Sequence, residues 1–116
     1  MNLREYLLNE AIKPLDKAET SFYGKPVFVR EMSAAERDDF EMAQVEAAKT
    51  GDALRNFRAK FVIRVLVDEN GERVFKDEDA EVVGKMKPNE IRRVFDVGCK
   101  LNALTPEDEK DILKKS

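Results

Sequence analysis

In the stretch VREMSAAERDDF (residues 29–40), a short β-like run passes directly into the start of a helix. Ser33 is followed three residues later by Glu36, which is the spacing of a capping box. In this motif the serine hydroxyl accepts a hydrogen bond from the Glu36 amide, and the glutamate side chain accepts one from the Ser33 amide. The stretch therefore predicts a strand-to-helix junction, with structural roles for Ser33 and Glu36 and a helix that continues to about Lys49.

Two further elements are predicted on the N-terminal side of this junction. Leu3, Leu7 and Leu8 recur at helical spacing within residues 1–14 and predict a short amphipathic helix. An isolated helix of this length is marginal in water, so it either docks on the domain or binds a partner helix or another subunit. Between residues 20 and 30, aromatic and β-branched residues flank a turn signal and predict a small β-hairpin.

Two longer helices are predicted on the C-terminal side of the junction. Asp52 is expected to cap a helix that runs to Val65, although the β-branched residues within 61–67 leave open that its end becomes a strand. Pro88 is expected in the first turn of a second helix, which runs to Asn102. Both helices carry apolar stripes, which predict that they run antiparallel and share a core; the stripe residues are Phe57, Phe61, Val65, Phe95 and Leu101.

A turn and two short helices complete the predicted chain. Asn70 and Gly71 have the composition of a type I′ turn, which would let residues 66–67 pair with residues 74–75 as a minimal hairpin. The acidic segment that follows predicts a short helix, because acidic residues in a first turn complement the helix dipole. Residues 106–116 predict a short C-terminal helix.

Together these elements predict a mainly α fold. We expect a single small helical domain over residues 1–116, with about five helices and one or two short β-hairpins. In it, residues 1–14 form the amphipathic helix, either docked or mobile, and residues 106–116 form the C-terminal helix. A chain of 116 residues is the size of one ordinary domain and needs no metal or disulfide to be stable.

The composition excludes several classes of partner. Hydrophobic residues make up 42% of the chain and charged residues 39%, which is enough for a core beneath a highly charged exterior. The 21 Lys and Arg against 24 Asp and Glu give a net charge of −3, without the basic footprint that nucleic-acid binding needs. No secretory signal is recognised, and no apolar run approaches the roughly 20 residues of a membrane-spanning helix. We therefore expect a cytosolic protein that binds neither nucleic acid nor membrane.

Residue types for catalysis and metal binding are scarce. The chain has no histidine, which removes the commonest general base and the commonest transition-metal ligand. Its single cysteine, Cys99, is expected to be a small core side chain and not a nucleophile. The acidic residues between Asp68 and Asp79 lack the spacing of an EF-hand calcium loop, because Gly71 falls too early in the segment. We expect a protein that is not an enzyme and that has no metal or cofactor.

The junction is one of several strings that resemble, in order and spacing, a family of small tail assembly chaperones of long-tailed bacteriophages. The resemblance covers most of the chain and includes a leading amphipathic helix and the VREMSAAERDDF junction. It continues in the segments Arg58–Val62, Val67–Phe75, Asp77–Asp79, Ile91–Phe95 and Leu101–Leu104. Each string alone is common, and it is their order and spacing together that indicate the family.

The resemblance implies a non-enzymatic helper of tail assembly. Members of such a family bind the long, aggregation-prone tape measure protein, keep it soluble and help bring tail tube subunits to it, without remaining in the finished tail. For this chain it implies the tape measure and tail tube proteins of the same phage or prophage as partners, in the host bacterial cytoplasm. A homo-oligomer is also expected, because repeated copies along one client gain affinity by multivalency.

Apolar residues on the predicted helices are the candidates for partner binding, because a chaperone for an apolar helical client needs accessible hydrophobic surface within a charged exterior. The candidates are Leu3, Leu7, Leu8, Met42, Val45, Val62 and Leu66, whereas Ser33, Glu36, Asn70 and Gly71 are assigned structural roles. Two alternative functions stay open. One is a small structural phage protein, such as a head–tail connector or tail completion protein, and the other is an unrelated helical protein-binding adaptor.

Overall fold

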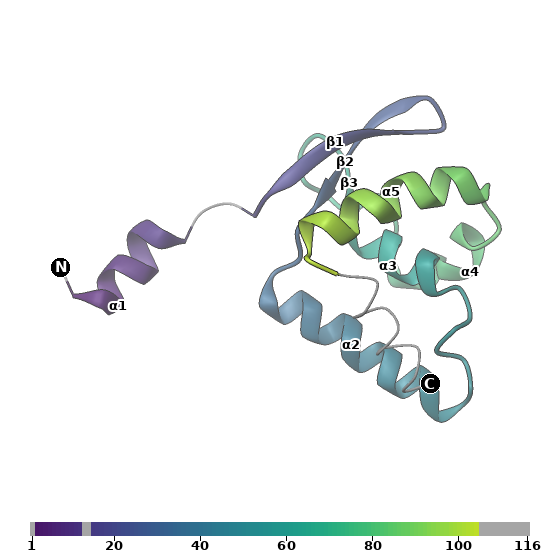
Figure 1. Cartoon of the computed structure of the whole chain (residues 1–116), viewed down its shortest axis with the longest axis horizontal. Coiled ribbons are helices and arrows are strands. Elements are labelled where there is room, and N and C mark those ends of the chain that lie inside the picture. The colour runs from purple at the N-terminus through teal and green to yellow at the C-terminus, as the bar shows by residue number, and fades with distance from the viewer. Residues whose placement is uncertain (1, 13–14, 105–116) are drawn as a thin grey trace.

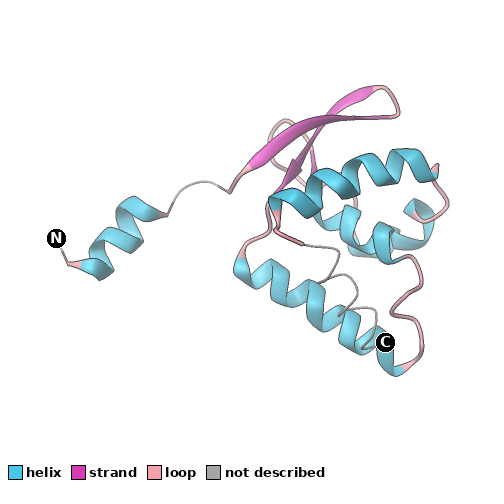
Figure 2. Ribbon diagram, in the orientation of Figure 1, coloured by secondary structure: helices cyan, strands magenta, loops and turns pink. Residues whose placement is uncertain are grey.

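The computed structural model describes residues 2–12 and 15–104, which form a three-stranded sheet with helices packed against it and a separate N-terminal helix (Figure 1, Figure 2). In chain order the elements are α1 (Leu3–Tyr6), the π-helix η1 (Leu7–Ala11), β1 (Lys17–Phe22), β2 (Lys25–Arg30), α2 (Ala34–Lys49), α3 (Phe57–Val65), β3 (Leu66–Val67), the 3₁₀-helix η2 (Asp77–Asp79), α4 (Ala80–Val83) and α5 (Pro88–Leu101). The fold is therefore helix-rich with a small sheet, which corrects in part the prediction of a mainly α domain with hairpins alone. The predicted helix at residues 106–116 lies outside the described residues.

The hairpin predicted between residues 20 and 30 is present as β1 and β2. Its two-residue turn consists of Tyr23 and Gly24, whose φ angles of 52° and 77° are the positive values of a type I′ turn. A tyrosine rarely adopts this conformation, and two hydrogen bonds hold it there. The Tyr23 hydroxyl accepts from the Lys87 amide (2.9 Å), and the Tyr23 amide donates to Glu90 (3.1 Å). The tip of the hairpin is thereby fixed to the start of α5.

The end of α3 continues as the strand β3, an outcome that the sequence left open. β3 pairs antiparallel with β2, and both of its residues, Leu66 and Val67, are fully buried. On its other edge β3 forms the predicted hairpin in a reduced form that is displaced by one residue: Val67 makes an isolated antiparallel bridge with Arg73, and the Val74 amide donates to the carbonyl of Leu66 (3.1 Å). A two-residue hairpin exposed to water is marginal, and the pairing of β3 with β2 on the opposite edge stabilises it, because both apolar side chains are then buried.

The turn at Asn70 and Gly71 is present, but it is not of type I′. Gly71 has a φ of 81°, whereas Asn70 is not among the described residues with positive φ. The Gly71 amide donates to the carbonyl of Asp68 (3.0 Å), and the Asp68 amide donates to the carbonyl of Glu72 (2.9 Å). This is the pattern of a type I turn followed by a left-handed bulge residue, which explains why glycine is needed at position 71 but not at 70.

The helix α2 has the predicted bounds, but α3 begins later than predicted. Its N-cap is Asn56, in the left-handed region with a φ of 55°, and not Asp52. The difference arises from the segment between the helices, where the buried side chain of Gln44 donates a hydrogen bond to the carbonyl of Ala53 (2.9 Å). A buried polar group needs such a partner, so Ala53 is held in a turn and not in a helix.

The helices α3 and α5 run in the same direction, which corrects the prediction that they are antiparallel. Phe57, at the start of α3, contacts Phe95 with ring centroids 6.2 Å apart, whereas Val65, at the end of α3, lies against Gly98 further along α5. The direction follows from residues 66–87, which carry the chain back across the domain before α5 begins (Figure 1). Helical periodicity identifies the buried face of each helix but not the direction in which it runs.

Four phenylalanine rings from α2, α3 and α5 form a closed cycle in the core. The ring centroids are 6.2 Å apart for Phe40 and Phe57, 6.2 Å for Phe57 and Phe95, 5.4 Å for Phe95 and Phe61, and 5.6 Å for Phe61 and Phe40. Three of these contacts are edge-to-face and one is tilted, and such geometries add to the gain from burial. These ring contacts pack α2 against the rest of the core.

Candidate partner-binding surfaces

The strand-to-helix junction is held by contacts between β2, α2 and α3. Ser33 Oγ accepts a hydrogen bond from the Glu36 amide (3.2 Å), and Glu36 Oε1 accepts one from the Ser33 amide (3.0 Å), so the capping box is present. The Arg30 guanidinium forms an ion pair with Glu36 and donates to the carbonyl of Arg64 (3.3 Å). These contacts fix the angle between β2 and α2, which is a structural role.

The ion pair also makes Glu36 more acidic than an ordinary glutamate. Burial raises the pKa of its carboxyl, but hydrogen bonds from the Ser33 amide and from Arg30, together with the charge of Arg30, outweigh burial and lower the pKa. Because the folded-state pKa is lowered, the carboxylate stabilises the fold above its unfolded-state pKa. That contribution is lost as the pH falls through the folded-state pKa, so it is complete at neutral pH.

Replacing Ser33 by alanine is expected to lower the free energy of unfolding by about 1 kcal/mol, because the Glu36 amide loses its cap. Urea denaturation at pH 7 measures the change. Ser33→Thr is the matched control and should retain most of the stability, because it keeps the hydroxyl. No loss of partner binding is expected in either variant; binding that disappeared while stability stayed unchanged would place the junction within a binding surface.

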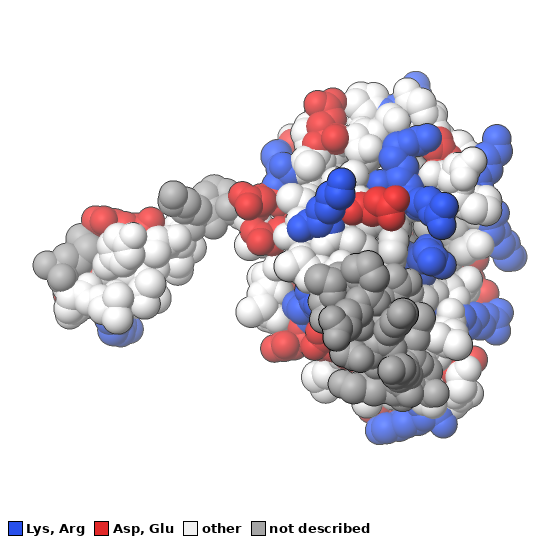
Figure 3. All heavy atoms as spheres, viewed as in Figure 1, with Lys and Arg blue, Asp and Glu red and all other residues white. Residues whose placement is uncertain are grey.

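The N-terminal helix, formed by α1 and η1, stands apart from the rest of the described structure (Figure 1). None of its residues is buried. Its large apolar side chains are accessible, with exposed fractions of 71% for Leu3, 47% for Leu7, 49% for Leu8 and 67% for Ile12. In the space-filling view this helix shows a broad uncharged surface between a small acidic and a small basic patch (Figure 3). The candidates Leu3, Leu7 and Leu8 thus lie on an uncovered apolar face.

The helix α2 carries a second exposed apolar surface. Met42 and Val45 are 66% and 54% exposed and lie three residues apart, which places them on one face of the helix. They point away from the core, because the buried residues of α2 are Phe40 and Gln44 on the other side. We call Met42 and Val45 the α2 surface.

The remaining two candidates, Val62 and Leu66, are not accessible. Both side chains are 0% exposed. Val62 lies within α3 in the main core cluster, and Leu66 pairs with Val29 of β2. Their assignment to partner binding is therefore corrected to core packing. The physical reason is that the run at residues 61–67 is apolar on nearly every side, so the sheet and the helices cover it completely.

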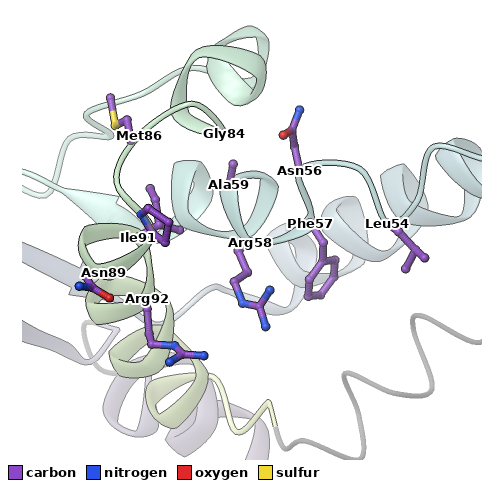
Figure 4. A pocket seen from close by; sticks show the side chains of 11 residues that line it. Leu54, Asn56, Phe57, Arg58, Ala59, Gly84, Met86, Asn89, Ile91 and Arg92 are labelled. Atoms are coloured by element: carbon purple, nitrogen blue, oxygen red, sulfur yellow. The ribbon is translucent and has the colours of Figure 1, made fainter.

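A groove of about 480 Å³ opens between the start of α3, the loop after α4 and the start of α5 (Figure 4). We call it the α3–α5 groove and define it by Leu54, Phe57, Arg58, Met86, Ile91 and Arg92. Phe57 and Ile91 are buried in its floor, and the Leu54 side chain is 57% exposed. Arg58 and Arg92 line the groove from α3 and α5 and are exposed (Figure 4), and the Arg58 guanidinium lies over the Phe95 ring, 5.4 Å from its centroid. The groove therefore combines an apolar floor with a basic rim.

The groove was not expected from the sequence, because α3 and α5 were predicted to run antiparallel. Antiparallel helices would have placed the start of α3 and the start of α5 at opposite ends of the domain. Gly84 also lines the groove, and a Cβ atom there would lie 2.2 Å from the side-chain oxygen of Asn56, so a larger residue at position 84 would displace that side chain. The sequence signal that was available is weak, because a glycine and two arginines far apart in the chain form no recognisable motif.

Neither a metal-binding cluster nor a membrane-spanning helix occurs in the part of the chain that the structure describes. Within residues 2–12 and 15–104, no group of three or more His, Cys, Asp or Glu side chains is placed to hold a metal ion. In the same ranges no helix has the length and apolar character needed to cross a membrane. Cys99 is half-buried in α5 and packs against the core. Candidate surfaces for a partner within the described residues include the N-terminal helix, the α2 surface and the α3–α5 groove.

Comparison with known proteins points to one family. The sequence profile described as "Phage tail assembly chaperone" matches residues 19–115. Among solved structures, the tail assembly chaperone of bacteriophage HK97 is similar, with 21% sequence identity, a TM-score of 0.49, and coverage of 80% of this chain and 97% of that chain. No curated protein sequence matches the chain. Because the family profile spans residues 19–115, well over half of its length, the chain belongs to the phage tail assembly chaperone family.

Proposed function

We propose that this chain binds the tape measure protein of its phage or prophage, keeps it soluble in the host bacterial cytoplasm and promotes assembly of the tail tube around it. Membership of the tail assembly chaperone family is the observation that carries the proposal. The tail tube protein is the second proposed partner. The chaperone acts as a homo-oligomer and leaves before the tail is complete. The proposal assigns no catalytic step and no cofactor to the chain.

The α2 surface is the proposed contact for the tape measure protein. Met42 is unbranched and flexible, so it can adapt to different apolar side chains along an extended helical client. Glu41 and Glu46 flank the surface in the sequence and are exposed, which supports solubility of the chaperone when no client is bound. An apolar surface bordered by charge can therefore bind a client without causing the chaperone to aggregate.

Co-expression of the full chain with the tape measure protein from the same locus tests this proposal. The wild-type chain is expected to raise the soluble fraction of the tape measure protein and to co-purify with it. Met42→Ser/Val45→Ser should weaken co-purification by about tenfold, because two exposed apolar contacts are lost. The matched control is Val74→Ser/Val82→Ser, which changes side chains that are 46% and 60% exposed elsewhere on the surface.

The co-expression experiment tests the proposed function and the proposed role of the α2 surface separately. A wild-type chain that neither solubilises nor co-purifies with the tape measure protein would contradict the proposed function. Full activity of Met42→Ser/Val45→Ser would instead contradict the assignment of the α2 surface. Mass spectrometry of purified virions checks the release of the chaperone; a stoichiometric amount of the chain in the particles would indicate a structural tail or connector protein.

A further inference from the structure

The tip of the β1–β2 hairpin and the start of α5 exchange hydrogen bonds in a reciprocal way (Figure 1). The amide of Tyr23 donates to Glu90 Oε1 (3.1 Å), and the amide of Lys87 donates to the Tyr23 hydroxyl (2.9 Å). Glu90 also forms an ion pair with Arg93, which donates to the carbonyl of Ser21 (3.4 Å). The hairpin tip is therefore held on α5 by side chains from both elements.

Glu90 occupies the position from which a glutamate normally caps its own helix. Lys87 is the N-cap residue of α5, with extended backbone angles (φ −61°, ψ 129°), and Glu90 follows it by three residues. Ser33 and Glu36 have the same spacing at α2, where Glu36 accepts directly from the Ser33 amide (3.0 Å). At α5 the Lys87 amide donates to Tyr23 instead, so the hairpin tip has replaced the glutamate as its acceptor.

This exchange of partners holds Tyr23 in a costly backbone conformation. Its φ of 52° lies in the left-handed region, which residues with a Cβ atom adopt at a cost in free energy. Both of its hydrogen bonds are exposed, and such bonds contribute little net stability because water competes for the same groups. Release of the tip relieves the strain and leaves Glu90 free to accept from Lys87. The bonded and released arrangements therefore differ little in free energy.

The residues beside Lys87 form a wall of the α3–α5 groove. Met86, Pro88 and Asn89 all line the groove (Figure 4). A second hollow of about 420 Å³ is lined by Tyr23 and Lys87 and shares Pro88 and Asn89 with the groove. The segment at residues 86–89 thus separates the two, and the bond from Lys87 to Tyr23 fixes this wall to the hairpin.

We propose that the hairpin tip is a latch with two states that controls the shape of the α3–α5 groove. In the closed state, which the structure shows, Tyr23 accepts from Lys87 and Glu90 accepts from Tyr23. In the open state Glu90 accepts from the Lys87 amide, as Glu36 does from Ser33, and the polar groups of Tyr23 turn to water. Opening frees the wall at residues 86–89 from the hairpin.

Amide hydrogen exchange, measured by NMR on the full chain, distinguishes the latch from a fixed cap. Tyr23→Phe removes the acceptor of the Lys87 amide. With a fixed cap, the Lys87 amide alone should exchange about tenfold faster. The latch predicts the opposite result, because Glu90 moves to Lys87. The Lys87 amide should then stay protected, and the amide at position 23, which loses Glu90, should exchange about tenfold faster.

Two further variants complete the experiment. Tyr6→Phe is the matched control, because the two tyrosines are 47% and 45% exposed, and it should change neither amide. Glu90→Ala removes the alternative acceptor, so the Lys87 amide should lose its protection in Tyr23→Phe/Glu90→Ala but keep it in Glu90→Ala alone. Faster exchange of the Lys87 amide, without a change at position 23, in Tyr23→Phe would overturn the latch.

The methyl resonance of Met86 tests the coupling to the groove. Tyr23→Phe favours the open state and should shift this resonance, whereas Tyr6→Phe should leave it unchanged. An unchanged Met86 resonance in a protein whose amide at position 23 is released would overturn the coupling, because the tip would then move without the groove. Both measurements use the chain without a client, so a failure here is distinct from a failure of the proposed function.

Discussion

Phe61→Ala is expected to lower the free energy of unfolding by about 3–5 kcal/mol, because it removes a fully buried aromatic side chain. The Phe61 side chain is 0% exposed and makes edge-to-face contacts with both Phe40 and Phe95. Its removal opens the ring cycle and leaves a cavity where α2, α3 and α5 meet. The neighbouring side chains are fixed by the sheet and by their own helices, so they can fill the cavity only in part.

Urea denaturation of the two proteins measures this loss, with Phe61→Leu as the control that retains most of the apolar volume and should cost less. A second variant tests the packing directly, because a Cβ atom on Gly98 would lie 2.7 Å from the Phe61 ring. Gly98→Ala should therefore destabilise the wild type but be tolerated in the Phe61→Ala background, where the ring is absent. Additive effects of these two substitutions would contradict the contact, and a loss below about 1 kcal/mol for Phe61→Ala would contradict its central position.

Asn102→Ala is expected to lower the free energy of unfolding by about 2–3 kcal/mol, because one side chain joins the end of α5 to the strand-to-helix junction. Asn102 Oδ1 accepts a hydrogen bond from the Met32 amide (2.7 Å). Its Nδ2 donates to the carbonyl of Gly98 (2.8 Å) and, at 3.4 Å, to that of Arg30. Truncation leaves the Met32 amide without this acceptor and removes both bonds from Nδ2, although the Gly98 carbonyl keeps its bond from the Asn102 amide (3.0 Å). An unsatisfied, partly buried amide costs more than the net value of a single hydrogen bond.

Asn102→Asp is the matched control for this position. Aspartate keeps the acceptor for the Met32 amide but loses both donors to carbonyl oxygens, so an intermediate loss of stability is expected. Thermal and urea denaturation should rank the three proteins as wild type, Asn102→Asp and Asn102→Ala. Equal stability of Asn102→Ala and the wild type would show that the hydrogen bonds from Asn102 are replaced by water.

Local features of the fold could be predicted from the sequence because their causes lie within a few residues. The capping box at Ser33 and Glu36 needs two side chains three positions apart, and Pro88 marks the first turn of α5 by its fixed backbone angle. The acidic segment that begins the η2 and α4 turns follows the same logic. The wrong prediction at Asn70 also has a local cause. The composition indicated a type I′ turn, whereas hydrogen bonds to Asp68 stabilise a type I turn followed by a bulge residue.

The candidate site could be predicted only in part, for a reason of packing. Leu3, Leu7, Leu8, Met42 and Val45 were assigned as apolar and accessible, and each is exposed. Val62 and Leu66 have the same residue character, but they are buried. The identity of an apolar residue does not show whether its side chain will be covered, because burial depends on segments far away in the chain. Asn102 was missed for the same reason, since its partners at Met32 and Arg30 are about 70 residues distant.

By itself, the sequence determined the capped junction at residues 29–40, the positions of the main helices and the indication of a family. Each of these features depends on residues that are close together in the sequence or on the order of short sequence motifs. Only the tertiary structure decided that α3 and α5 run in the same direction, that β3 joins β2, and that the α3–α5 groove exists. The physical reason is that periodicity specifies only which face of a helix or strand is buried. The direction of α5 relative to α3 depends instead on the path of the connecting segment, residues 66–87, across the domain.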